Sequence, residues 1–140
     1  MFDAVTTVPA PANEPIKTYV SGSPERAALE TKIKELAGEP VDLTMTIGGV
    51  QRMGGGDWVD VVQPHNTSHV LGRFGEATDE DVAAAIEAAK LAAPGWRELS
   101  FDDRAAVILR AAELLSGPWR DTLNAATILG QSKSPYQAEI

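Results

Sequence analysis

The sequence predicts an α+β fold that is dominated by helices and contains a small group of antiparallel strands. Apolar residues recur with the helical period before residue 38 and after residue 78, whereas they alternate with polar residues between residues 41 and 74. The 140 residues suit a single domain. With 44% apolar and 23% charged residues, the composition is that of a globular chain and not of a disordered one.

The first part of the chain predicts an extended arm followed by a helix. Residues 1–22 contain several prolines and little periodic apolar pattern, which favours an extended arm. Ser23 and Pro24 are typical of the N-cap and the first position of a helix, and a single apolar stripe follows them. We therefore expect a helix over Pro24–Ala37, with Gly38 just beyond its end.

The next part predicts short strands joined by glycine turns. The alternation in Leu43–Ile47 indicates a strand, and Gly48-Gly49 after it is a candidate hairpin turn. Two further apolar segments, Trp58–Val62 and Val70–Phe74, complete the expected antiparallel group. Gly54–Gly56 is expected to form a flexible turn.

Helical periodicity then returns and holds to the last residue. Three helices are predicted, with these start and stop signals: Thr78 to Pro94-Gly95, Ser100 to Ser116-Gly117, and Pro118 to Gly130. Ser134–Gln137 is a capping box with proline at the first helical position, which indicates the start of a fifth helix. Because the sequence stops at Ile140, we expect residues 23–140 to be an incomplete domain that ends inside a helix; a frayed terminal turn is the alternative.

Charge and cysteine content exclude several classes of function. The chain has 20 acidic and 12 basic residues and a net charge of −8, which argues against nucleic-acid and anionic-membrane partners. No apolar run is long enough to span a bilayer. The absence of cysteine excludes disulfides, zinc–thiolate sites and a cysteine nucleophile within these residues. Residues 1–18 resemble neither a signal peptide nor a transit peptide, so we expect a cytoplasmic location.

Two motifs could suggest ligand sites. Gly54–Gly56 could form a phosphate loop, but an acidic residue and a strand pattern follow it, and a surface turn is the favoured interpretation. His65 and His69 have the spacing of a helical metal pair. They lie in a segment that is typical of a loop, and no pattern places a third ligand, so we expect solvated loop histidines.

Polar residues elsewhere have structural interpretations. Asp79–Asp81 and Asp102-Asp103 could act as acid–base pairs, but both groups lie at predicted helix starts, where the helix dipole explains them. Arg104 and Arg110 are expected to form ion pairs with these acids. Ser132-Lys133 has no companion that would indicate an activated nucleophile. We therefore expect no catalytic, cofactor-binding or metal-binding residue in the chain.

The sequence resembles the opening part of the aldehyde dehydrogenase superfamily. The segments that carry this resemblance are Ile47-Gly48-Gly49, Val61-Val62-Gln63-Pro64, Ala77–Ala89 followed by Trp96, Arg104, Ala111–Leu115 and Gly130–Glu139. Other segments are similar to one branch, the delta-1-pyrroline-5-carboxylate dehydrogenases: Asn13-Glu14-Pro15, Gly22–Arg26, Leu115–Arg120, Gly130–Lys133 and Gln137–Ile140. The resemblance extends from about Asn13 to Ile140.

The resemblance implies the NAD-dependent oxidation of L-glutamate γ-semialdehyde to glutamate in proline degradation. In this family a cysteine thiolate attacks the aldehyde, hydride passes to NAD, and activated water releases the acid. The residues that perform these steps in the family lie downstream of the segment that matches Ile140. The resemblance therefore implies the first part of an α/β NAD-binding domain, with NAD bound by the complete enzyme and not by this chain alone.

Alternatives from other classes remain open at this point. The chain could be a short interaction module that docks on a full-length dehydrogenase protomer, because its apolar stripes exceed what its own core can cover. In the leading interpretation, the partner of these stripes is instead the rest of the dehydrogenase chain. A small nucleotide-binding or metal-binding domain would rest on the glycine and histidine motifs alone.

Overall fold

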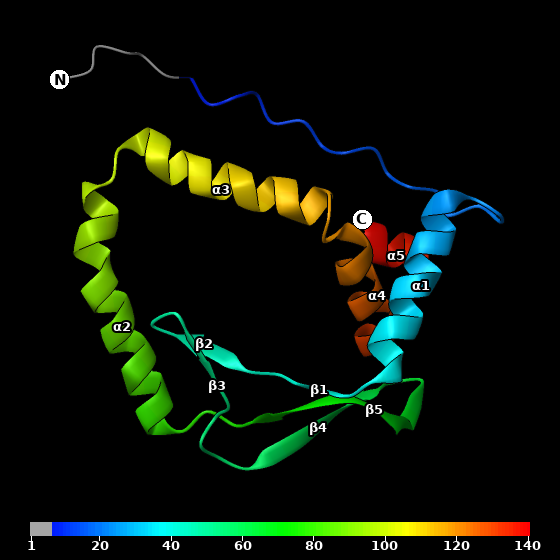
Figure 1. The fold of residues 1–140 in the computed structure, drawn as a ribbon, viewed down its shortest axis with the longest axis horizontal. Helices are drawn as coiled ribbons and strands as arrows, with labels where there is room; N and C mark the ends of the chain where they lie inside the picture. Colours follow the sequence, from blue (N-terminus) through cyan, green and yellow to red (C-terminus); the bar gives the residue numbers. More distant parts are fainter. Residues whose placement is uncertain (1–6) are drawn as a thin grey trace.

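The helices and strands of the chain are the sides of an open frame (Figure 1). The computed structural model describes residues 7–140. The elements are, in order, α1 (Pro24–Gly38), β1 (Val41–Asp42), β2 (Met45–Ile47), β3 (Val50–Arg52), β4 (Trp58–Gln63), β5 (Asn66–Gly75), α2 (Asp79–Glu98), α3 (Phe101–Ser116), α4 (Arg120–Gln131) and α5 (Pro135–Glu139). The predicted combination of helices with small antiparallel sheets is confirmed.

The buried core lies where α1 packs against α4. Leu29 from α1 and Ala125 from α4 are almost fully buried, and Tyr19 from the preceding segment joins them. Ser23 caps α1 by accepting a hydrogen bond from the Arg26 N–H at 3.3 Å, as the sequence predicts. Gly38 differs from the prediction because it belongs to the last turn of α1.

The strands form two small sheets. β4 and β5 pair antiparallel through a tight turn in which Gln63 pairs with Asn66, and β1 adds to β5 in parallel. β2 and β3 form a hairpin at the predicted turn, in which Gly48 and Gly49 adopt the positive φ values of 59° and 82° that this turn requires. The sequence does not predict β1, because two residues are too few to display a period. It does not predict β3 either, because Val50 is the only apolar residue of that strand.

Two glycines allow the turn before β4 to cross the end of β5. A Cβ on Gly54 would lie 2.2 Å from the Gly75 carbonyl oxygen, and a Cβ on Gly75 would lie 2.3 Å from the Gly54 oxygen. The N–H of Gly56 donates to the Glu76 carbonyl at 2.9 Å. The predicted turn at Gly54–Gly56 is therefore closely packed against the end of the sheet.

α2 continues past its predicted stop at Pro94-Gly95 and ends at Glu98, so that predicted boundary is wrong. Proline removes one helical hydrogen bond, but its fixed φ is compatible with a helix. Arg104 donates from Nη1 to the carbonyl oxygens of Arg97 and Leu99, at 3.4 and 2.7 Å, and so satisfies backbone groups at the end of α2. Arg104 thus contacts these carbonyls, where the sequence predicted an ion pair.

The remaining helix boundaries agree in part with the sequence. α3 begins after Ser100 and ends at Ser116, as predicted. α4 begins two residues after Pro118 and runs through Gly130 to Gln131, so its predicted ends are wrong. Its C-cap is Ser132, which adopts a left-handed φ of 54°, whereas the sequence predicted that Gly130 would end the helix.

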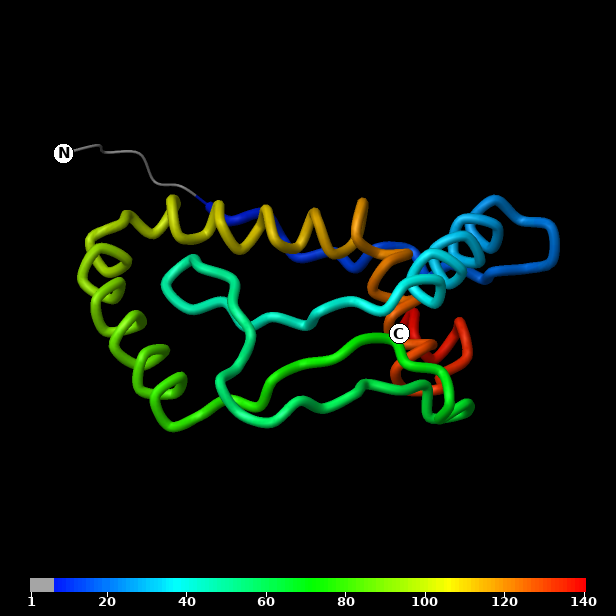
Figure 2. The backbone as a smooth tube through the Cα atoms, turned by 60° about the horizontal axis from the view of Figure 1, so that its bottom comes forward, coloured from blue at the N-terminus to red at the C-terminus, as the bar shows by residue number. Residues whose placement is uncertain are grey.

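The N-terminal segment and the long helices lie at the edge of the frame. Residues 7–20 form neither helix nor strand, and their first part passes beside α3 in both views (Figures 1 and 2). α2 and α3 form two sides of the frame, while α1, α4 and α5 gather at one corner (Figure 1). The apolar stripes of α2 and α3 remain largely exposed, as expected from the sequence.

Candidate functional site

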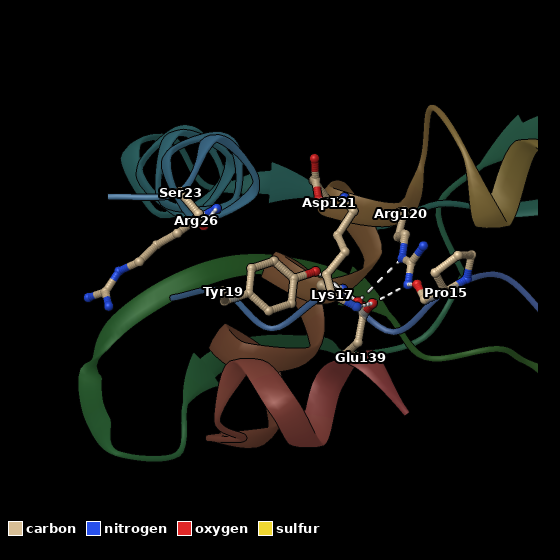
Figure 3. Close-up of polar contacts among 9 residues, drawn as sticks. Pro15, Lys17, Tyr19, Ser23, Arg26, Arg120, Asp121 and Glu139 are labelled. Atoms are coloured by element: carbon tan, nitrogen blue, oxygen red, sulfur yellow. Dashed lines mark hydrogen bonds and ion pairs between the residues drawn. The ribbon is translucent and has the colours of Figure 1, made fainter. Parts of the chain in front are cut away.

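The most highly connected polar group in the described residues is the carboxylate of Glu139 on α5. Its Oε1 accepts hydrogen bonds from the backbone N–H of Lys17, at 2.7 Å, and from the guanidinium of Arg120. Its Oε2 accepts from the Tyr19 hydroxyl and the Asn124 amide, each at 2.7 Å, and from Arg120 Nε at 3.3 Å. These five residues form the Glu139 cluster, most of which appears in Figure 3.

The cluster joins three parts of the chain that are distant in sequence. Lys17 and Tyr19 belong to the segment before α1, Arg120 and Asn124 belong to α4, and Glu139 belongs to α5. Arg120 also donates from Nη2 to the Pro15 carbonyl oxygen at 2.7 Å. A second ion pair joins Lys17 Nζ to Asp121 Oδ1 at 2.8 Å.

The electrostatics of the cluster favour a charged carboxylate and a neutral phenol. Burial alone would raise the pKa of Glu139, but the hydrogen bonds that it accepts, led by that from the Lys17 N–H, lower this pKa from 4.5 to about 2. Burial, together with the neighbouring Glu139 carboxylate, raises the pKa of Tyr19 from 10.0 to about 12. At neutral pH the carboxylate is ionised and the hydroxyl carries its proton.

The geometry of the cluster suits a structural role. The Glu139 side chain has no exposed surface, and five donor groups from four residues already occupy its two oxygens. A general base needs an oxygen that can reach a substrate proton. Glu139 instead holds backbone and side-chain donors in fixed positions.

The backbone N–H groups of the glycine turn at Gly54–Gly56 decide whether it could act as a phosphate loop. In the structure the N–H of Gly55 donates to Asp81 Oδ2 at 2.9 Å, and that of Gly56 donates to a backbone carbonyl. Asp81 also accepts from Arg52 at 2.7 Å and from the Thr78 N–H at 3.1 Å. Since a carboxylate occupies the place where a phosphate would need free donors, these residues do not fit the phosphates of a nucleotide.

Asp81 therefore has a structural explanation, as expected for an acid at a helix start. It forms a capping box with Thr78 at the start of α2. The hydrogen bonds from the backbone of Gly55 and then of Thr78 are the main causes that lower its pKa. At the start of α3, Ser100 and Asp103 form a similar pair, with the Ser100 hydroxyl donating to the Asp103 carboxylate at 2.7 Å.

The two histidines contact different elements. His65 Nδ1 lies 2.7 Å from the Ser132 hydroxyl oxygen, while His69 Nε2 lies 2.9 Å from the Ala37 carbonyl oxygen. The expectation that both lie in a loop is wrong for His69, which belongs to β5 and is half-buried. The turn is confined to Pro64 and His65, so the strand begins earlier than predicted.

Ser132 and Lys133 lie in the connection between α4 and α5. Ser132 is the left-handed C-cap of α4, and its contact with His65 joins this connection to the turn between β4 and β5. Within residues 7–140, no three His, Cys, Asp or Glu side chains gather closely enough to hold a metal ion. No helix of this same region is long and apolar enough to cross a membrane.

A second candidate surface is apolar and lies along α2 and α3. Val82, Ile86 and Leu91 on α2 are each at least half exposed. A hollow of about 430 Å³ at the joint of the two helices is lined mainly by apolar side chains. Its lining residues are Val8, Trp96, Phe101, Arg104, Ala105, Ile108 and Leu109. A series of exposed apolar side chains along two helices is typical of a surface that another protein segment covers.

The Glu139 cluster was not found by sequence reasoning. Its members are separated by up to 122 positions, and the segment that contains Lys17 and Tyr19 has no periodic apolar pattern. The left-handed φ of Tyr19 could not be predicted either, because tyrosine rarely adopts this conformation. The capping box at Ser134–Gln137, which positions α5, was the one available signal, and the structure confirms it.

Comparison with known proteins gives consistent relatives. The family model described as "Aldehyde dehydrogenase family" matches residues 51–139. The delta-1-pyrroline-5-carboxylate dehydrogenase of Agaricus bisporus is 38% identical over 138 residues, which are 98% of this chain and 25% of that protein. The mitochondrial human enzyme of the same name is 38% identical over 129 residues, or 92% of this chain and 23% of the relative.

Solved structures show the same relationship. The delta-pyrroline-5-carboxylate dehydrogenase of Mycobacterium tuberculosis, in a crystal structure bound with NAD, is 56% identical and superimposes with a TM-score of 0.96. This match covers 99% of the present chain and 26% of the other. The 140 residues thus span about a quarter of the length of the proteins that they match.

Proposed function

Because the chain belongs to the aldehyde dehydrogenase family, we propose that it forms the N-terminal part of the cofactor-binding domain of an NAD-dependent L-glutamate γ-semialdehyde dehydrogenase. That enzyme would oxidise the semialdehyde to glutamate. The observation that carries the proposal is the match to the mycobacterial enzyme, with 56% identity and a TM-score of 0.96 over 99% of the chain. The names of the curated relatives support the same substrate.

In this proposal the 140 residues supply scaffold and no reacting group. The chain contains no cysteine, so the thiolate that attacks the aldehyde would come from another part of the polypeptide. The Asp81 carboxylate already accepts the Gly55 N–H of the glycine turn. Both oxygens of Glu139 already accept hydrogen bonds from neighbouring residues. NAD is accordingly proposed for the complete enzyme, with its binding residues outside this chain.

The apolar faces of α2 and α3 are proposed to pack against the remainder of the dehydrogenase. Side chains such as Ile86, Ile108 and Leu115 are at least half exposed, and each would gain free energy if it were buried. The covering surface would belong either to the rest of the same polypeptide or to a full-length protomer. The second possibility describes an interaction module, and the same exposed faces support it.

The direct test compares the 140 residues with the natural gene product that contains them. Each would be incubated with NAD and pyrroline-5-carboxylate, and NADH formation would be followed by absorbance. We expect turnover from a longer gene product and none from the 140 residues alone, with no thermal shift of the short chain by NAD. Turnover by the short chain would contradict the proposed scaffold role.

A cytoplasmic location is part of the proposal and needs its own test. Several relatives are named mitochondrial, whereas the name of the Agaricus bisporus relative gives no compartment. Fractionation of the source cells, with an antibody against residues 24–140, would show the protein in the cytoplasmic fraction. Its recovery in an organelle fraction would contradict this expectation.

A further inference from the structure

We infer that residues Pro15–Tyr19 form a strap that docks and releases together with α5, with Glu139 as the residue that couples them. Within residues 7–140 the strap pairs with no strand, and donors and acceptors from α4 and α5 hold it instead (Figure 3). The inference concerns the folded chain itself and does not depend on the proposed activity.

The contacts of the strap come from alternate residues. Pro15 and Lys17 contact α4 and α5 through backbone groups and Tyr19 through its hydroxyl, whereas Ile16 and Thr18 between them are exposed. One side of the strap is therefore devoted to contacts with α4 and α5, and the other side faces away from them.

Glu139 is the contact that the strap and α5 share. One carboxylate oxygen accepts the Lys17 N–H, and the other accepts the Tyr19 hydroxyl, while Arg120 and Asn124 approach from α4. Because Glu139 belongs to α5, this helix supplies the acceptor that the strap needs, and the strap supplies donors that hold Glu139 in place.

The backbone at Tyr19 indicates that the docked strap is held against a local strain. Tyr19 has a φ of 51°, in the left-handed region that large side chains rarely adopt. Its ring is buried with Leu29 and Ala125, and its hydroxyl lies between Glu139 and Asn124. Without the hydroxyl, Tyr19 would keep its unfavourable φ but lose two hydrogen bonds that hold the docked strap. The strap would therefore release more readily.

Two variants test the coupling from its two ends. Glu139→Gln replaces a carboxylate that only accepts by an amide whose nitrogen cannot accept, so it mismatches several of the donors around it. Tyr19→Phe removes only the hydroxyl and leaves the ring in the core. Matched controls are Glu113→Gln, in an exposed pair with Arg110, and Tyr136→Phe, whose residue is 62% exposed on α5.

Amide hydrogen exchange in the natural polypeptide that carries these residues would measure the effect. Glu139→Gln should accelerate exchange of the Lys17 amide by about tenfold or more, because that amide loses a charged acceptor. Tyr19→Phe removes one hydrogen bond to Glu139. It should therefore accelerate exchange of the Ala138 amide, which donates to the Ser134 carbonyl within α5, because the two segments are coupled. Both controls should leave both segments unchanged.

The reciprocal effect decides the inference. If Tyr19→Phe left the Ala138 amide as protected as in the unmodified protein, the strap and α5 would be independent and the inference would be overturned. Unchanged exchange at Lys17 in Glu139→Gln would overturn it equally. Tyr19→Phe retains the buried ring, so this arm remains informative even if Glu139→Gln does not fold.

Discussion

At the scale of single residues, Glu139 shows how a buried charge is made compatible with a protein interior. A carboxylate removed from water loses a large hydration free energy, which only close and correctly oriented donors can offset. Lys17, Tyr19, Arg120 and Asn124 provide such donors to both oxygens of Glu139. The result is a group whose charge is part of the folded structure.

This charge predicts a specific dependence of stability on pH. The pKa of Glu139 is about 2 in the folded chain, below its ordinary value of 4.5. The stabilisation is therefore complete above about pH 4.5 and is lost as the pH falls through the range down to about 2. Urea unfolding at a series of pH values would detect the loss, and Glu139→Gln should reduce the slope in this range.

Tyr19 predicts the opposite dependence at alkaline pH. Its pKa is raised from 10.0 to about 12, so the folded state favours the protonated hydroxyl. The stabilisation is complete below about pH 10 and is lost as the pH rises to about 12. Ultraviolet titration of the phenols should show one late-titrating tyrosine that is absent in Tyr19→Phe. An unshifted titration of both tyrosines would contradict the cluster as described.

Gly75 predicts the effect of adding one methyl group where two backbones cross. In Gly75→Ala the new Cβ would lie 2.3 Å from the Gly54 oxygen, so the crossing must open. We expect a loss of about 1–3 kcal/mol in the free energy of unfolding. Gly95→Ala is the matched control, because Gly95 lies within α2 with nothing near its Cβ position. That substitution should be neutral or stabilising, by up to about 1 kcal/mol.

At the scale of elements, side-chain caps explain where most helices begin. Ser23, Thr78, Ser100 and Ser134 each accept the expected hydrogen bond, so local chemistry sufficed to predict these starts. Helix ends were less predictable, because they depend on distant groups. α2 passes Pro94 and ends where Arg104 of the next helix meets its carbonyls.

The same reasoning explains which parts of the candidate sites escaped prediction. The hairpin at Gly48-Gly49 is visible in the sequence because its conformation depends on adjacent residues. The parallel pairing of β1 with β5 and the Glu139 cluster depend on residues that are 15 to 122 positions apart. No local period reports such contacts, so only the folded chain reveals them.

Asp81 predicts how firmly the glycine turn is attached to α2. In Asp81→Asn, one oxygen that accepts from Arg52, Gly55 or Thr78 is replaced by an amide that cannot accept. The Gly55 amide should then exchange about tenfold faster, because it loses a charged acceptor. Glu87→Gln, in an exposed pair with Lys90, is the control and should leave that amide unchanged. Equal exchange in both variants would show that Asp81 does not hold the turn.

At the scale of the whole molecule, buried and exposed apolar residues are unevenly distributed. The core at the α1–α4 contact is small, while α2 and α3 carry long apolar side chains at their surfaces. α2 and α3 form two sides of an open frame (Figure 1), and many of their large apolar side chains are exposed. In the proposed dehydrogenase, further protein would cover the two helices and so remove this imbalance.

If further protein covers α3, one substitution should have a small effect on the stability of the 140 residues alone and a large effect on that of the complete dehydrogenase. Ile108 is 63% exposed on α3, so Ile108→Lys should change the stability of the 140 residues alone by no more than about 0.5 kcal/mol. In the complete dehydrogenase the same change would bury a lysine in place of an isoleucine and should cost more than about 2 kcal/mol. Denaturant unfolding of both proteins measures the difference, and equal small effects would contradict the covering.

The most direct measurement of the central claim is the intact mass of the natural product. The protein would be isolated from cells that carry the unaltered gene, by means of an antibody against residues 24–140, and weighed by mass spectrometry. The account predicts a mass roughly four times the 14.9 kDa of these residues, because they span about a quarter of their relatives. A mass near 14.9 kDa would contradict it and would favour a separate interaction module.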